Sequence, residues 1–112
     1  MAQAHSVDHW TNELNQLIAF AIQLTMKVYS GDKFATWANQ WISGEDRSEN
    51  SAFEAEEDAA LDWQRAETLS PEWRAAKAAW EVAWAARLLA MNDMKRAAGT
   101  AARAIELAEG IK

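Results

Sequence analysis

Alanine and tryptophan dominate the apolar residues of this chain, and that pairing limits the folds open to it. The stretch SPEWRAAKAAWEVAWAARLLA, residues 70–90, sets three tryptophans in a background of alanine. Alanine is the best helix former, and no segment alternates apolar with polar residues as a half-buried strand does. Among 112 residues, 25 are alanine and seven are tryptophan. We therefore expect an all-α protein, one domain over residues 1–112 that folds as a compact bundle of four to five helices.

The ends of the helices are marked by capping residues. Apolar residues recur every three or four positions in five segments, at about residues 7–29, 32–44, 52–68, 71–91 and 94–110. Side-chain oxygens of Ser, Thr, Asp and Asn cap the first turn of a helix, and glycine follows its last turn. The predicted N-caps are Asp32, Ser70, and Ser51 in a capping box with Glu54, and the predicted stops are Gly44 and Gly110.

Three tryptophans form one line along the predicted 71–91 helix. Trp73, Trp80 and Trp84 fall within one narrow sector at 100° per residue, opposite a face made mostly of alanine. A helix that is apolar on two faces is usually central in its bundle. Its narrow polar sector contains Arg74, Lys77 and Glu81. Two interpretations of the rings remain, core filling or a groove for a ligand or partner helix, and core filling is favoured.

Negative charge is concentrated in the middle of the chain. Residues 1–44 carry a net charge of −1, residues 45–72 carry −8, and residues 73–112 carry +3. Proteins that bind nucleic acid directly need a clustered basic surface to neutralise phosphates, and this chain lacks one. A partner protein with a basic surface is the better match.

The acidic block contains an apolar residue on its outward face. Glu54, Glu57 and Asp58 stand at i, i+3 and i+4 of the predicted helix, around an outward Leu61. Like charges at this spacing cost an isolated helix a few tenths of a kcal/mol, so a benefit elsewhere is expected. Interfaces often place an apolar anchor inside a charged rim. We therefore predict that these four residues bind the partner.

A further acidic residue of this segment points inward. Glu56 projects close to the alanine face of the predicted helix, and Arg87 lies near the tryptophan line of the 71–91 helix. Buried charges need a partner. We predict that Glu56 pairs with Arg87.

Residues that could hold a metal ion or perform catalysis are sparse. His5, His9 and Glu13 would stack on one helical face, but no other histidine completes a site, so a solvated surface is the preferred interpretation. The chain has no cysteine, no glycine-rich phosphate loop and no plausible Ser/His/Asp set. We expect no catalytic, cofactor-binding or metal-binding residues, and no cofactor.

One enzymatic alternative stays open. All-helical nucleotide pyrophosphohydrolases bind Mg²⁺ through carboxylates at the spacing of Glu54, Glu57 and Asp58. Such enzymes also need a second acidic helix opposite the first. The nearest candidate for that second helix is the pair Glu106 and Glu109.

Neither export nor membrane insertion is predicted. The segment MAQAHSVDHW has no basic start or apolar core of a signal peptide, and the longest apolar run, LIAFAI, is far shorter than the ~20 residues of a membrane span. We expect a soluble, cytoplasmic protein without membrane contact.

Four segments together resemble a known group of proteins. WISGE at Trp41 to Glu45, followed by AALDWQRA, AAKAAWEVAWAARLLA and AAGTAARAIELA, is similar to the alanine- and tryptophan-rich, all-helical immunity proteins of bacteria and phages. The resemblance covers roughly residues 30–108. It implies a helical fold that binds and neutralises a toxin or another partner without catalysis.

These features favour a small acidic inhibitor that neutralises a partner protein. It would act as an immunity-like antitoxin, or as a phage-encoded inhibitor of a host defence complex whose acidic block imitates nucleic-acid phosphates. The alternatives are a self-assembling structural subunit, which would form a homodimer through the two-faced 71–91 helix, and the metal-dependent pyrophosphohydrolase.

Overall fold

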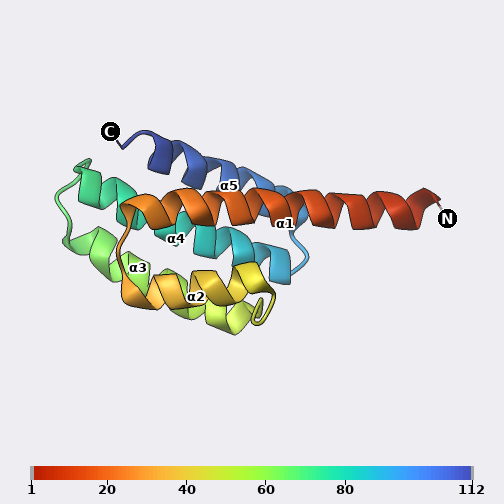
Figure 1. Ribbon diagram of the computed structural model, residues 1–112. Helices are drawn as coiled ribbons and strands as arrows, with labels where there is room; N and C mark the ends of the chain where they lie inside the picture. Colours follow the sequence, from red (N-terminus) through yellow and green to blue (C-terminus); the bar gives the residue numbers. More distant parts are fainter. Residues whose placement is uncertain (1, 112) are drawn as a thin grey trace.

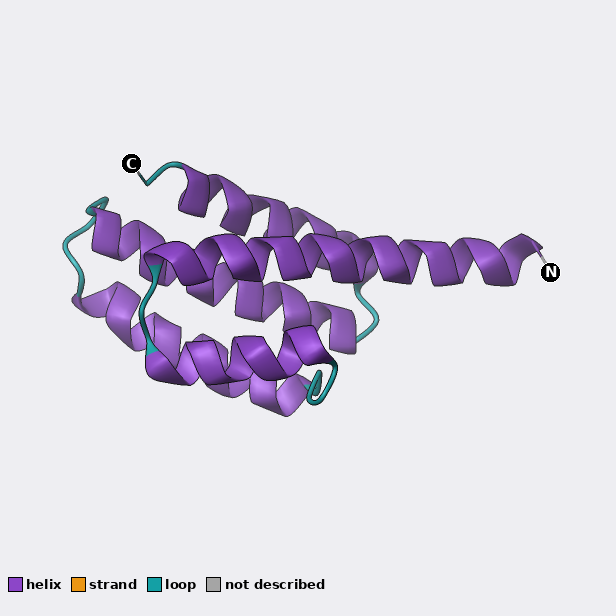
Figure 2. Cartoon of the chain, in the orientation of Figure 1, coloured by secondary structure: helices purple, strands orange, loops and turns teal. Residues whose placement is uncertain are grey.

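Five helices account for nearly all of the chain that the structure describes. The computed structural model describes the backbone of residues 2–111 and the side chains of residues 11–111. The helices are α1 (Ala2–Val28), α2 (Asp32–Ser43), α3 (Glu49–Arg65), α4 (Pro71–Ala90) and α5 (Met94–Glu109). Residues 2–111 contain no strand (Figure 2). The predicted all-α bundle of four to five helices is confirmed.

The central helix of the bundle is α4. It packs most extensively against α3 and α5 and also against α1, whereas α2 packs mainly against α3. Figure 1 shows α1 crossing in front of α4, with α5 on one side and α2 on the other. The N-terminal turns of α1 extend beyond the other helices, so the molecule is elongated, 51 × 24 × 19 Å.

Alanine makes the central position of α4 possible. Interaxial distances depend on the side chains at the contact, and methyl groups allow neighbouring backbones to approach closely. The buried alanines of α4 are Ala75, Ala76, Ala78, Ala79, Ala83, Ala85 and Ala86. They form the expected alanine face, so α4 buries most of its circumference within one chain.

Larger side chains fill the core between α1, α2 and α4. Phe34 and Trp41 of α2, Ile18 and Ile22 of α1, and Val82 of α4 are at most 1% exposed. Burial of such side chains contributes about 1.5–3 kcal/mol each. Among the described residues, no helix combines the length and the hydropathy that a membrane-spanning segment requires.

Three of the predicted helix ends are confirmed. Gly110 directly follows α5, which ends at Glu109. Ser70 Oγ accepts a hydrogen bond from Trp73 N at 3.1 Å, with Pro71 in the first turn of α4. Gly44 follows α2 with a φ of 82°, a left-handed conformation that glycine adopts without strain.

Other predicted ends are wrong by a few residues. Ser51 does not cap α3, because its hydroxyl donates to Asp46; Ser48 caps the helix instead and accepts from Ser51 N at 3.2 Å. Asp32 is the first residue of α2 rather than its cap, since Gly31 holds that position without a side-chain hydrogen bond. The third helix ends at Arg65, three residues before the predicted end, because Ala66 has extended backbone.

Close packing around α4 predicts a steric limit on side-chain size. Ala83→Leu should lower the free energy of unfolding by about 1–3 kcal/mol, because Ala83 is completely buried and added methylenes force its neighbours apart. Urea unfolding measures the change. The control is Ala102→Leu at an exposed position of α5, which should stay within about 0.5 kcal/mol of the parent. Equal stability of the two variants would contradict the tight packing.

Candidate functional site

The predicted partner-binding residues lie on one face of α3. Glu54 and Glu57 are exposed, and Leu61 keeps 50% of its surface accessible. Asp58 lies at the edge of this face nearest α2, where its Oδ1 is 3.9 Å from Lys33 Nζ. We call Glu54, Glu57, Asp58 and Leu61 the α3 patch. It presents an exposed leucine one turn along α3 from the exposed carboxylate of Glu57 and two turns from that of Glu54, and the carboxylate of Asp58 is paired with a lysine at its edge.

The opposite edge of α3 is tied to α4 through one arginine. Arg87 Nη1 donates to Glu56 Oε2 at 3.3 Å, and Arg87 Nε is 3.8 Å from Glu49 Oε1. The guanidinium carbon lies 4.6 Å from the ring centre of Phe53 and 5.0 Å from that of Trp84. Burial raises the pKa of Glu56, and Arg87 opposes the rise. The predicted Glu56–Arg87 pair is confirmed, and the buried Arg87 Nε has no hydrogen-bond partner among the described residues.

The tryptophan line of α4 lies at the rim of the core. Trp73, Trp80 and Trp84 are half-buried, and the Trp63 ring of α3 packs 6.0 Å from Trp73 and 5.4 Å from Trp80. Lys77 Nζ lies 4.8 Å from the Trp73 ring centre and 5.4 Å from that of Trp63. Cations attract the faces of aromatic rings. The rings therefore have partners inside the chain, which favours a structural role over an open ligand groove.

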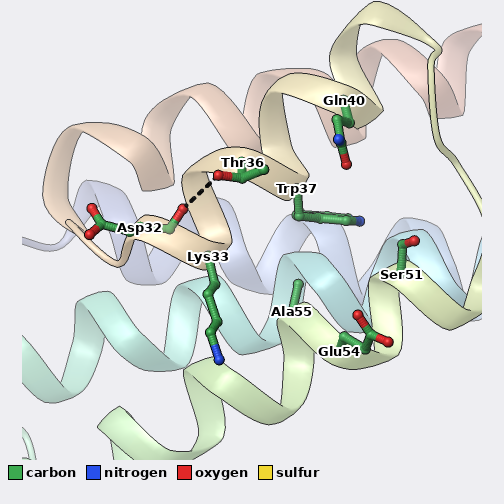
Figure 3. A pocket seen from close by; sticks show the side chains of 8 residues that line it. All are labelled: Asp32, Lys33, Thr36, Trp37, Gln40, Ser51, Glu54 and Ala55. Carbon is green, nitrogen blue, oxygen red and sulfur yellow. Dashed lines mark hydrogen bonds between the residues drawn. The ribbon is translucent and has the colours of Figure 1, made fainter.

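A groove lies between α2 and α3. Its volume is about 320 Å³. The lining residues, drawn in Figure 3, are Asp32, Lys33, Thr36, Trp37 and Gln40 of α2 and Ser51, Glu54 and Ala55 of α3. Trp37 is 4% exposed, and its indole Nε1 has no hydrogen-bond partner among the described residues. Glu54 belongs to both the groove and the α3 patch, so the two surfaces are continuous.

The loop between α2 and α3 fixes one end of this groove. Asp46 accepts from Ser48 N at 3.0 Å and from the hydroxyl of Ser51, and these hydrogen bonds lower its pKa. Arg47 Nε donates to the carbonyl of Trp41 at 2.8 Å, and its guanidinium carbon lies 4.3 Å from the Trp41 ring centre. The loop is therefore held to both helices.

A tyrosine links the end of α1 to α3. The Tyr29 hydroxyl donates to Asp62 Oδ2. Burial, followed by the hydrogen bond and charge of Asp62, raises the pKa of Tyr29 above its ordinary value. This bond helps to hold α3 against the layer formed by α1 and α2.

One acidic residue of α4 is buried. Helical spacing places Glu81 in the narrow polar sector of α4, but α5 packs against α4 and leaves Glu81 only 5% exposed. Its Oε2 is 3.4 Å from Arg103 Nε, and it lines a second groove with Arg74, Lys77, Glu106 and other α4 and α5 residues. Burial raises the pKa of Glu81, and the charges of Arg103 and Lys77 oppose this. A helical wheel of α4 shows that Glu81 lies in the polar sector, but it cannot show that α5 covers this sector.

The acidic residues of α3 and α5 do not face one another. Glu106 and Glu109 are exposed on α5, and α4 lies between α5 and α3 (Figure 1). Where side chains are described, no three His, Asp or Glu residues are grouped to hold a metal ion. The side chains of His5 and His9 lie outside the described residues. The structure thus lacks the facing acidic helices that the pyrophosphohydrolase alternative requires.

The burial of Glu81 predicts a pH dependence of stability. Its pKa in the folded state is raised above the ordinary value of 4.5, so the folded state binds this proton more tightly than the unfolded state does. Stability from this group is present at low pH and is lost as the pH rises through the folded-state pKa. Glu81→Gln should therefore become progressively more stable relative to the parent as the pH increases from about 4.5 to 7.

Urea unfolding at a series of pH values measures this difference. Glu106→Gln is the control, because Glu106 lines the same groove but is exposed. Its stability should follow that of the parent across the series. A Glu81→Gln curve parallel to the parent curve would contradict the prediction.

Comparisons with known proteins do not assign the chain to a family. No family model, no curated protein and no solved structure matches it. The function must therefore be argued from the surfaces described above.

Proposed function

We propose that this protein is a small acidic inhibitor that binds and neutralises a partner protein with a basic surface. The observation that carries the proposal is Leu61, half exposed on the outward face of α3 beside the exposed carboxylates of Glu54 and Glu57. An apolar anchor bordered by charge is the arrangement that interfaces use to attract and then hold a charged partner.

The charge distribution supports a basic partner. Residues 45–72, which contain α3, carry a net charge of −8. The positively charged Arg87 of α4 is engaged with Glu56 and Glu49 on the other edge of α3, away from the patch. Exposed carboxylates therefore dominate the patch, and they would speed association with a positively charged surface by electrostatic steering.

Two biological forms of this function fit the same surface. As an immunity-like antitoxin, which the resemblance to alanine- and tryptophan-rich immunity proteins implies, the protein would cover a toxin. As a phage-encoded inhibitor of a host defence complex, it would place carboxylates where that complex binds nucleic-acid phosphates. Neither form needs a catalytic group or a cofactor.

The other functional classes have weaker support. Self-assembly through α4 would need a free apolar face, but ten residues of α4 are already buried within one chain. Hydrolysis of nucleotides would need carboxylates opposite the α3 patch, and the acidic pair of α5 lies beyond α4.

A charge-reversal experiment tests the α3 patch. The parent protein, immobilised, is used to capture proteins from an extract of its source cells, and the captured protein is purified for affinity measurement by biolayer interferometry. One variant combines Glu54→Lys, Glu57→Lys and Asp58→Lys. It should bind the partner at least 100-fold more weakly than the parent does, with a nearly unchanged melting temperature. Leu61→Asp should weaken binding by about 30-fold, which corresponds to about 2 kcal/mol.

The matched control changes the same number of exposed charges elsewhere. Glu72→Lys, Glu106→Lys and Glu109→Lys alter net charge equally but lie outside the patch. This control should retain most of the affinity. Loss of binding in both triple variants would show that net charge alone matters, and retained binding in the patch variant would reject the α3 patch as the interface.

A further inference from the structure

We propose that the α2–α3 groove binds one lysine or arginine residue of the partner protein, through a hydrogen bond from Trp37 and an ion pair with Glu54. This inference rests on the proposed function, because the residue in the groove belongs to the same basic partner that contacts the α3 patch.

Trp37 supplies a hydrogen-bond donor that the fold leaves without an acceptor. Trp37 is only 4% exposed, and its Nε1 has no hydrogen-bond partner in the described part of the chain. Buried donors in native proteins are nearly always paired, so an unpaired one lining a groove indicates a missing acceptor. Figure 3 shows the nitrogen edge of the indole directed toward the end of the groove where Gln40, Ser51 and Glu54 lie. A carbonyl oxygen of a ligand would satisfy it.

The other polar groups at this end select a positively charged ligand. The carboxylate of Glu54 accepts only, and no ion pair joins it to any described residue. Lys33 also lines the groove, but its Nζ is 3.9 Å from Asp58 Oδ1 and so already has a carboxylate partner. Gln40 offers both a donor and an acceptor. A basic residue within a peptide has a group for each of these three side chains. Its carbonyl would accept from Trp37, its N–H would donate to Gln40, and its cationic side chain would pair with Glu54.

The dimensions fit one residue and its side chain. A volume of about 320 Å³ is at the small end of the range for ligand sites. At 1.5 Å rise per residue, the α2 segment from Lys33 to Gln40 is roughly 10 Å long, comparable to an extended arginine. Glu54 joins the groove to the α3 patch, and Leu61 lies two helical turns farther along α3. One partner surface can therefore reach both.

The indole protons report directly on occupancy. N-acetyl-arginine amide is titrated into the ¹⁵N-labelled full chain, and the indole signals of the seven tryptophans are followed by NMR, with Trp37→Phe identifying the Trp37 signal. We expect the Trp37 indole proton to move downfield as it gains an acceptor, while the other indole signals stay in place. N-acetyl-aspartate amide should cause no shift, because Glu54 repels its carboxylate.

Matched carboxyl variants test the ion pair. Glu54→Gln should weaken binding of N-acetyl-arginine amide at least tenfold, and Glu72→Gln, at an exposed position of α4 outside the groove and the α3 patch, should leave it unchanged. The proposal is overturned if the Trp37 signal stays still up to the solubility limit of the amide. It is also overturned if Glu54→Gln binds as tightly as the parent, or if the aspartate amide produces the same shift.

The groove and the α3 patch can fail separately. If the captured partner binds Glu54→Gln and the parent equally well but loses affinity for Leu61→Asp, the groove proposal is wrong and the proposed function stands. If N-acetyl-arginine amide binds as expected and the partner binds Glu57→Lys and Leu61→Asp, which both leave Glu54 intact, as tightly as the parent, the groove stands and the α3 patch is rejected. These readouts remain valid if Trp37→Phe does not fold, since Glu54 is exposed and its replacement does not touch the core.

Discussion

Contacts between alanine side chains around α4 set the helix spacing on which the rest of the bundle depends. Because α4 presents methyl groups on most of its circumference, α1, α3 and α5 can approach it closely. Close approach keeps the indole rings of α4 itself out of the centre of the bundle. Trp73, Trp80 and Trp84 therefore lie at the rim, with one ring face against the protein and cationic side chains such as Lys77 beside them.

The contrast between α4 and α2 explains where an open groove can form. The side chains that α2 buries are mostly large, Phe34, Trp37 and Trp41, and those of α3 facing inward are mostly alanine. A large ring against a methyl group holds the two backbones apart, and the flanking polar side chains do not fill the gap. The groove is thus a result of unequal side-chain sizes. It is separate from the second groove, which α4 and α5 line.

Much of the fold follows from local signals in the sequence. Apolar spacing located all five helices, and the Ser70 cap and the Gly44 stop act within a few residues of their positions. The errors arise where distant residues intervene. The hydroxyl of Ser51 donates to Asp46, so Ser48 caps α3 instead, and packing of α5 buries Glu81 of the polar sector of α4. Neither effect can be read from the periodicity of one helix.

The candidate site was predictable in part for the same reason. Helical spacing places Glu54, Glu57 and Leu61 on one face without reference to any other helix, whereas the partnership of Asp58 with Lys33 depends on how α2 lies against α3. Spacing at i, i+3 and i+7 also puts Trp37 on the same face of α2 as Phe34 and Trp41, and all three are buried. It could not show that the indole nitrogen lacks an acceptor, because this depends on which α3 side chains lie opposite.

Continuity between the groove and the patch bears on the kind of ligand. A small molecule that fills about 320 Å³ would use Trp37, Gln40 and Glu54, and would leave Leu61 exposed to water two turns away. A protein surface can insert a basic side chain beside Glu54 and cover Leu61 at the same time. Burial of the leucine then adds to the ion pair, and exclusion of water from the rim strengthens the electrostatic contact. Both surfaces are explained by one occupant only if that occupant is a protein.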